Sequence, residues 1–386
     1  MQIVAAATAG LLGFGIVYVG FYVQHIQSAF TTQDIGSLLG SAASPGASPG
    51  STEPANPVDE NAGVALNILL IGSDTRSGDN GEIGGRVATG MRADTTIVMH
   101  ISADRTRVDF LSIPRDSRVA IPDCKLFSGE IAKGWTGKFN IAFANGGREG
   151  DAAAGAACTM KTITTLTGIN FPGNHYAVVD FVGFEQMINA VHGVPMCITE
   201  DINSSKAKLH LKAGAQVLNG KQALAWSRAR YGIGDGTDLG RIDRQHELLT
   251  NLVRKLLGMN MLTDASEATS FVKSAAQSLT MDPQLGSLSY LLGLGYSLRN
   301  IDADSINFMT VPWKYPGDKS GDVVWTPDAD VVFERIGSDV PMDGGTPVSI
   351  TATPSSPAQV AGVAPTPSSD TPVRETEKQI LADCNV

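Results

Sequence analysis

The chain has 386 residues, of which 42% are hydrophobic and 18% are charged, so it carries enough apolar material for a sizeable core. Its formal net charge of -10 argues against a nucleic-acid partner, because phosphate backbones are bound through basic patches. Any anion site must therefore be a local cluster of arginines. One large α/β domain with tails fits this length.

The first 24 residues predict a transmembrane anchor. Residues 3–23 are apolar apart from small residues and two tyrosines, and this stretch is about as long as a bilayer core requires. A signal peptide is the alternative, but neither a basic start nor a small-residue cleavage site is evident. Residues 25–61 contain the stretch SAASPGASPGSTEPANP and predict a flexible spacer that lifts the next domain off the membrane.

Residues 62–336 form the predicted domain, and residues 337–386 a Pro/Ser/Thr-rich tail. Strands are expected at 67–72, 95–102, 107–113, 175–181, 194–199 and 306–312, and helices at 152–167, 182–191, 219–229, 241–257, 265–278 and 285–298. Residues 103–105 join two of these strands as a hairpin, so the sheet cannot be purely parallel. The pattern predicts an α/β fold, a three-layer α/β/α domain with a mixed central sheet.

The four cysteines form no metal-binding spacing. An even number on an anchored chain fits disulfide bonds outside the cytoplasm, with three connectivities open. We favour a bond between Cys124 and Cys158, because it would staple a loop-rich insertion. Four buried thiols are the alternative.

Charged residues follow or precede three of the predicted strands, in the sequences GSDTR, MRAD and IPRD. In open α/β sheets the ligand crevice lies where the strands end. Asp74 and Asp94 could jointly hold Mg2+, which prefers carboxylates, waters and substrate phosphate oxygens. The alternative is a pair of turn-forming aspartates.

A second cluster of arginines flanks a glycine-rich loop. Two of them close one predicted helix and two open the next: Arg228, Arg230, Arg241 and Arg244. Arginines three positions apart share a helix face, and a helix N-terminus favours anions. Because arginine forms bidentate pairs with phosphate oxygens, this cluster would suit a pyrophosphate. A salt-bridged surface is the alternative, with partners among Asp235, Asp238 and Asp243.

Six motifs occur in order between Leu66 and about Leu257: NILLIGSDTR, MRADTTIVMHI, FLSIPRDS, FVGFEQMINAVHGVPM, LKAGAQVLNGKQALAWSRAR and GDGTDLGRIDRQ. In these motifs the chain resembles the LytR-CpsA-Psr phosphotransferases of the cell envelope, in particular their high-GC Gram-positive members. The resemblance implies that Asp74 and Asp94 are metal ligands. It also implies that the pyrophosphate is bound by a set of seven residues: Arg92, Arg115, Arg228, Arg230, Arg241, Arg244 and Gln245. We add Arg76 to this set.

The resemblance further implies that a glycopolymer phosphate moves from a polyprenyl pyrophosphate carrier to a peptidoglycan hydroxyl. The enzyme would be a single-pass membrane protein with its catalytic domain outside the cytoplasm. Phosphoryl transfer is catalysed mainly by positioning and charge stabilisation, so Mg2+, or Mn2+ in its place, would act with Arg92 and Arg115 as catalytic residues. Asp235 and Asp238 are the candidates for accepting the proton of the attacking hydroxyl.

The lipid chain of such a carrier needs an apolar pocket. Residues 285–298, or the helix face with Val253 and Leu257, are candidates for its lining, and core packing is the alternative. Arabinogalactan, teichoic acid and capsule all fit as the polymer. Two other functions stay open, a lipid pyrophosphate hydrolase that uses water as acceptor and a non-catalytic envelope protein that binds polyprenyl carriers.

Overall fold

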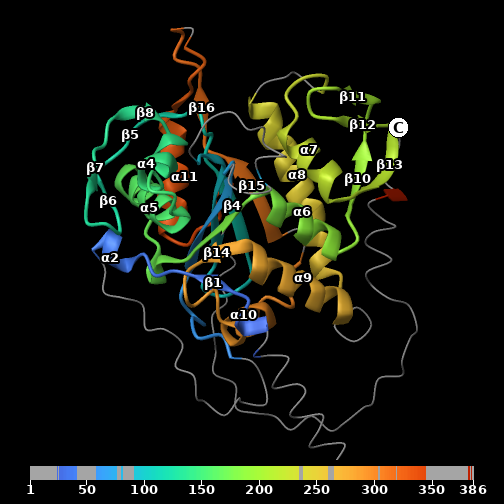
Figure 1. Ribbon diagram of the computed structural model, residues 1–386, viewed down its shortest axis with the longest axis horizontal. Coiled ribbons are helices and arrows are strands. Elements are labelled where there is room, and N and C mark those ends of the chain that lie inside the picture. Colours follow the sequence, from blue (N-terminus) through green and yellow to red (C-terminus); the bar gives the residue numbers. More distant parts are fainter. Residues whose placement is uncertain are drawn as a thin grey trace, which may run out of the picture.

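The computed structural model describes residues 24, 26–40, 58–75, 80, 91–233, 238–259, 265–302, 305–318, 320–344, 381–382 and 384. Most of them form one layered α/β domain (Figure 1). No helix within these ranges is long and apolar enough to cross a membrane. The predicted anchor, apart from Gln24, lies outside the described residues.

A mixed sheet forms the centre of the domain, as predicted, and it has seven strands among the described residues, in the order β1-β14-β9-β2-β3-β4-β15. Their bounds are Thr31–Thr32 for β1, Leu66–Ser73 for β2, Ala93–Ile101 for β3, Val108–Ser112 for β4, Tyr176–Val179 for β9, Leu279–Met281 for β14 and Ile306–Thr310 for β15. β2 runs parallel to β9 and antiparallel to β3, and the predicted hairpin joins β3 to β4. β2 and β4 are apolar runs covered on both faces, as central strands require.

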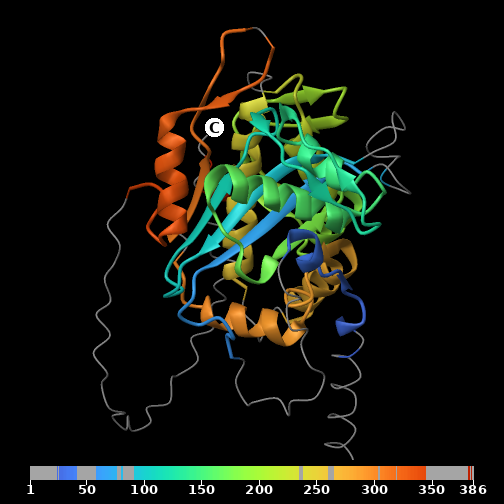
Figure 2. The same cartoon turned by 90° about the vertical axis from the view of Figure 1, so that its left-hand side faces the viewer.

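One face of the sheet packs against α4 (Ile141–Gly146), α5 (Ala152–Thr167) and α11 (Pro327–Gly337). In Figure 2 the green helices cross in front of the blue strands, and the orange-red α11 stands at the left beside them. α5 begins where the Asp151 side chain accepts a hydrogen bond from the Ala154 amide, and it ends at the left-handed Gly168. These two signals lie in the sequence, and they explain why the predicted bounds of this helix are confirmed.

The other face lies under α8 (Asp238–Leu257) and α10 (Leu288–Ser297). Leu66, Ile68 and Phe110 of the sheet pack here against Tyr290 and Leu294 of α10. α6 (Phe181–Ala190) packs beside this layer against both α7 (Gly220–Arg228) and α9 (Ala265–Ser278). Helices therefore cover both faces, which confirms the layered arrangement.

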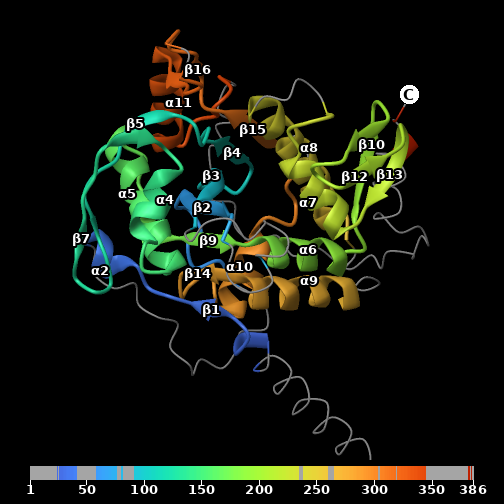
Figure 3. The same ribbon diagram turned by 45° about the horizontal axis from the view of Figure 1, so that its top comes forward.

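A smaller unit stands beside the sheet with a core of its own. β10 (Val194–Ile198) pairs with β13 (Gly214–Leu218), and β11 (Ile202–Ser204) pairs with β12 (Leu209–Leu211). Met196 and Trp226 are buried between these strands, α7 and α8. The predicted strand at 194–199 therefore forms outside the central sheet (Figure 3). A disulfide bond joins Cys197 of β10 to Cys384.

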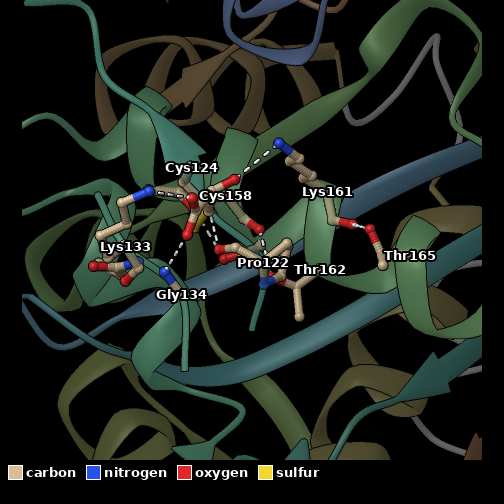
Figure 4. The surroundings of a disulfide bond; sticks show 12 residues. Pro122, Cys124, Lys133, Gly134, Cys158, Lys161, Thr162 and Thr165 are labelled. Atoms are coloured by element: carbon tan, nitrogen blue, oxygen red, sulfur yellow. Dashed lines mark hydrogen bonds and ion pairs between the residues drawn. A yellow bond between two sulfur atoms is a disulfide. The ribbon is translucent and has the colours of Figure 1, made fainter. Parts of the chain in front are cut away.

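The insertion after β4 consists of short strands paired two by two. β5 (Arg118–Ala120) pairs with β8 (Thr136–Lys138), and β6 (Cys124–Lys125) pairs with β7 (Ile131–Ala132). The disulfide favoured from the sequence, Cys124–Cys158, joins β6 to α5 (Figure 4). Lys161 of the same helix donates to the Asp123 carbonyl at 2.8 Å, so α5 holds this loop at two neighbouring points.

The structure differs from the predicted domain limits at both ends. Within the predicted spacer, β1 pairs with β14, and Ile35 beside α2 (Gly36–Leu39) is fully buried in the core. Beyond residue 336, Asp339 accepts hydrogen bonds from His100 and Arg107. Buried apolar and paired polar side chains mark folded chain, so the domain includes residues 26–40 and 337–344. The other residues of the predicted spacer and tail lie outside the described residues, apart from 58–61, 381, 382 and 384.

Candidate functional site

Three strand ends meet at one edge of the central sheet. β2 ends at Ser73, its antiparallel neighbour β3 begins at Ala93, and β4 ends at Ser112 beside it. The residues that flank these ends therefore lie together, although they come from three separate segments of the sequence. Four of the candidate residues are among them: Asp74, Arg92, Asp94 and Arg115.

Asp74 is fixed by the start of β3. Its amide donates to the Arg92 carbonyl at 2.9 Å, and its Oδ1 accepts from the Arg92 amide at 2.6 Å. The carboxylate is thereby held by the backbone, while the Arg92 side chain is exposed to solvent. This arrangement leaves the Arg92 guanidinium accessible to a ligand at the sheet edge.

Asp94 owes its position to a β-bulge. Gly72 pairs with Thr95 and Ser73 with Ala93, so Asp94 is the extra residue, without a partner on β2. Ala93 and Val98 pack in one core cluster, although an odd spacing would place them on opposite faces of a regular strand. The bulge thus reverses the alternation and re-aims the Asp94 side chain, as bulges beside active sites often do.

Two arginines bind Asp94 from different elements. Arg115, after β4, donates through Nη1 to Oδ1 of Asp94 at 2.6 Å, and their side chains are 16% and 23% exposed. Arg241 of α8 donates through Nη2 to the Asp94 carbonyl at 3.1 Å. The bulged residue therefore joins the strand edge to the first turns of α8.

The start of α8 is buried against the end of α7. Arg241, Arg244 and Gln245 are only 2%, 8% and 7% exposed. The two arginines are therefore buried and do not form the salt-bridged surface that was the alternative for them. The Arg244 guanidinium donates to the Ala229 carbonyl, and Gln245 donates to the Ser227 carbonyl at 3.0 Å. These two side chains hold the end of α7, and with it Arg228 and Arg230, against α8.

Arg228 lies against the start of α6. Its guanidinium stands 3.9 Å from the centre of the Phe181 ring. Asp180 caps this helix, accepting from the Gly183 amide at 2.8 Å and from Asn80 at 2.8 Å. The guanidinium therefore lies flat against the ring, and its planar fork of donors is of the kind that matches phosphate oxygens. Arg230, two residues on, is half-buried.

Three of the remaining candidates have no described side chain. Arg76 and Asp235 lie outside the described residues. Asp238 is the first residue of α8, and its side chain is not described either. The proposed proton acceptors and Arg76 stay predictions.

The structure adds three residues that the sequence motifs did not single out. Thr95 donates to Gln245 at 3.2 Å, which links β3 to α8 beside Asp94. Ser112, at the end of β4, lies 2.6 Å from Nε2 of His246. Burial lowers the pKa of His246, and nearby Asp243 opposes this shift only in part. The only signal in the sequence was adjacency, since Thr95 follows Asp94 and His246 follows Gln245.

The donor set at the sheet edge suits a hard cation. Within the described ranges, no group of three or more His, Cys, Asp or Glu side chains could hold a metal ion by itself. Mg2+ is commonly bound through one or two carboxylates, with waters and substrate phosphates completing its shell. Asp74 and Asp94 offer oxygen ligands of this kind on adjacent strands, so the residues present fit such an ion.

Comparison with known proteins identifies the family. The model of the LytR_cpsA_psr family matches residues 41–335. TagU of Enterococcus faecalis, named a polyisoprenyl-teichoic acid–peptidoglycan teichoic acid transferase, is 32% identical over 202 residues, which cover 52% of this chain and 57% of TagU. LcpB of Corynebacterium glutamicum, named a probable cell wall biosynthesis protein, is 33% identical over 237 residues, covering 59% of this chain and 50% of LcpB.

The chain thus spans about half the length of these curated relatives. Among solved structures, the protein gbs0355 of Streptococcus agalactiae has a TM-score of 0.55 and 23% identity over 73% of this chain and 89% of its own. At that identity the likeness shows the fold alone. Because the family model covers more than half of the sequence and most of the described domain, the chain belongs to the LytR-CpsA-Psr family.

Proposed function

We propose that the protein transfers a glycopolymer phosphate from a polyprenyl pyrophosphate carrier to a hydroxyl group of peptidoglycan. The observation that carries this proposal is the bulged Asp94, whose carboxylate binds Arg115 and whose carbonyl binds Arg241 at the strand edge. An acidic residue among arginines suits a pyrophosphate with a divalent cation. The name of the TagU relative describes a transfer of this class.

The reaction assigns separate tasks to the residues of the site. The acceptor oxygen forms a bond to the polymer-side phosphorus, and the bond from that phosphorus to the polyprenyl phosphate oxygen breaks. Polyprenyl phosphate leaves, and the hydroxyl proton passes to Asp235, or to Asp238, the first residue of α8. Arg92 and Arg115 would stabilise the negative charge that develops on the transferred group.

The other members of the predicted set would bind and orient the pyrophosphate. Arg228 and Arg230 would hold it from the end of α7, and Arg241, Arg244 and Gln245 would fix the geometry of that helix end. Asp74 and Asp94 are the residues that would hold Mg2+, or Mn2+ in its place. When bound, the cation would neutralise charge on the pyrophosphate oxygens.

A half-buried apolar surface lies on the sheet face beneath α8 and α10. Leu70 and Phe308 belong to it, and all residues of β15 are only half-buried. Leu285, Tyr290 and Leu294 are buried in the core cluster on this face, so core packing accounts for these members of residues 285–298, whereas Leu257 on the alternative face is exposed. We expect the polyprenyl chain to lie against the half-buried residues of the sheet face.

Disulfide bonds support a location outside the cytoplasm. All four cysteines are paired, as Cys124–Cys158 and Cys197–Cys384. Such bonds persist in oxidising compartments and are rare in the cytosol. The expected location is therefore the outer side of the cell membrane, with the apolar residues 3–23 as anchor.

A transfer assay on the full chain tests the proposal. A polyprenyl pyrophosphate-linked glycan would be incubated with the protein, with and without peptidoglycan, in the presence and absence of Mg2+. We expect acceptor-dependent transfer that requires the cation and falls sharply in Arg115→Lys. Arg118→Lys is the matched control, because Arg118 pairs with Asp318 and Asp322 nearby.

The same assay separates the other functions. Release of polyprenyl phosphate at full rate without peptidoglycan would show a hydrolase. Carrier binding without any turnover would show a binding protein. Arabinogalactan, teichoic acid and capsule precursors would be compared as donors, because the site geometry does not distinguish them.

A further inference from the structure

α10 is a surface helix without a charged residue in its 10 positions, LSYLLGLGYS. Tyr290 and Leu294 are buried beneath it, whereas Leu292 and Tyr296 on its outer side are 40% and 42% exposed. A surface helix of a soluble domain normally turns charged residues toward water. The outer side of α10 therefore has the composition of a contact surface.

Two neighbours extend this outer side. Arg299, one turn beyond Tyr296, places its guanidinium 3.8 Å from the centre of that ring. Val58 is 62% exposed, and its carbonyl packs so closely on Gly293 that a side chain there would meet it at 2.1 Å. We call Val58, Leu292, Tyr296 and Arg299 the α10 face.

The chain enters the domain directly at this helix. Gln27 donates to the Gly286 carbonyl at 2.6 Å and accepts from the Leu288 amide at 2.9 Å, so its side chain bridges the turn that begins α10. Thr32 then lies in β1, the outermost strand of the sheet, where it pairs with Met281 of β14. Figures 1 and 3 show these first described residues beside α10.

We propose that the α10 face lies in the headgroup region of the bilayer and holds the domain against the membrane. The inference rests on the membrane anchor of the proposed function. The apolar residues 3–23 are followed by Gln24, and the four steps along the chain from residue 23 to residue 27 reach at most about 14 Å. The start of α10 therefore lies within about 14 Å of the end of the apolar segment, close to a headgroup layer several ångströms thick.

The chemistry of the face favours lipid over a second copy of the chain. Tyrosine prefers the membrane–water interface, where its ring meets acyl chains and its hydroxyl meets water. Arginine beside it can bind lipid phosphate while its stem covers apolar surface. Leu292 and Val58 supply the apolar part of such a contact.

The placement sets the height of the candidate site. Leu66 packs under α10, and Ser73 at the other end of β2 borders the site, so one strand of 8 residues separates them. A strand of this length spans roughly 26 Å. In Figure 1 α10 lies at the end of the molecule opposite β16 (Trp313–Lys314), which follows the site end of β15. The domain would thus hold the site at a fixed distance above the lipid.

Site-specific fluorescence on the full chain, in nanodiscs prepared with either one or two chains per disc, tests this contact. An environment-sensitive dye would be attached at Leu292→Cys and, as matched control, at Val331→Cys, an exposed position of α11. Nitroxide lipids labelled near the headgroup should quench the dye at position 292 at least about twofold more than the dye at position 331. Tyr296→Cys is the substitute if Leu292→Cys does not keep the unfolding temperature of the parent chain.

Each outcome bears on the proposal. Equal quenching at both positions, with the chain still in the disc, would overturn the lipid contact while leaving the anchor intact. If the dye at position 292 is shielded from its surroundings only in discs with two chains, the α10 face would be assigned to a second copy of the chain instead. Loss of the chain from the discs would overturn the anchor as well, and none of these results depends on transferase activity.

Discussion

The two ends of the central sheet carry the same residue types in different surroundings. At the hairpin end, Arg105 pairs with Asp59 at 2.8 Å, the two side chains are 7% and 5% exposed, and Arg105 also donates to three backbone carbonyl groups. At the site end, the pair of Asp94 and Arg115 is 23% and 16% exposed, and Arg92 faces solvent. The degree of burial thus separates an arginine that holds the fold from one that a substrate can reach.

The largest effect should follow from breaking the hairpin end. Arg105→Met removes the charged partner of the buried Asp59 carboxylate and one donor to each of three backbone carbonyl groups. Removing one partner of a buried ion pair costs about 3–5 kcal/mol of stability. Urea unfolding of the full chain would measure it, with Arg118→Met as control, since exposed pairs contribute about 0–1 kcal/mol. Equal losses in both variants would contradict the distinction.

The sequence predicted the fold better than it predicted this distinction. The bounds of α5 follow from Asp151 and Gly168, both local signals, and the hairpin after β3 follows from its turn residues. Ile35 was missed because α2 has 4 residues, too few to show a helical period. Its burial depends on tertiary contacts with the core, which no local pattern contains.

The site was predictable as a set of residues but not as a geometry. The motifs placed Asp94 and Arg115 in separate loops, and only the sheet register brings them within 2.6 Å. The bulge at Asp94 was not predicted, because the expected strand began at Thr95 and left Asp94 before it. The sequence also did not show how far Arg105 and Arg115 differ in burial, since exposure is a property of the fold.

A smaller effect on stability, and a large one on activity, should follow at the site end. Asp94→Asn keeps the shape of the side chain but removes the charge that binds Arg115. Loss of one preorganised electrostatic group typically lowers turnover by roughly 10²–10³-fold. Asp104→Asn, in the turn that follows the other end of β3, is the control, because Asp104 bonds only to its own turn in the described contacts. Transfer at an unchanged rate in Asp94→Asn would remove this residue from the mechanism.

The smallest effect should be a difference in acid sensitivity between the two ends. Burial lowers the pKa of His246 at the site end below its ordinary 6.5. Burial alone would raise the pKa of Asp59 at the hairpin end, but hydrogen bonds from Arg105, the Asn61 amide and Ser297 outweigh it and leave the pKa below 3.8. The two ends therefore lose stability in different pH ranges.

The sign follows from proton binding. Below about pH 6.5 the unfolded chain protonates His246 while the folded chain resists, so stability falls with pH toward the folded pKa. Asp59 keeps its contribution above pH 3.8 and loses it only as the pH falls through its lowered pKa. His246→Gln should therefore flatten the pH dependence of the free energy of unfolding, as the pH falls from about 6.5 toward the folded pKa of His246. His210→Gln, at an exposed position, is the control. Urea unfolding of both variants at a series of pH values checks this, and parallel curves would show that His246 is not the group that titrates.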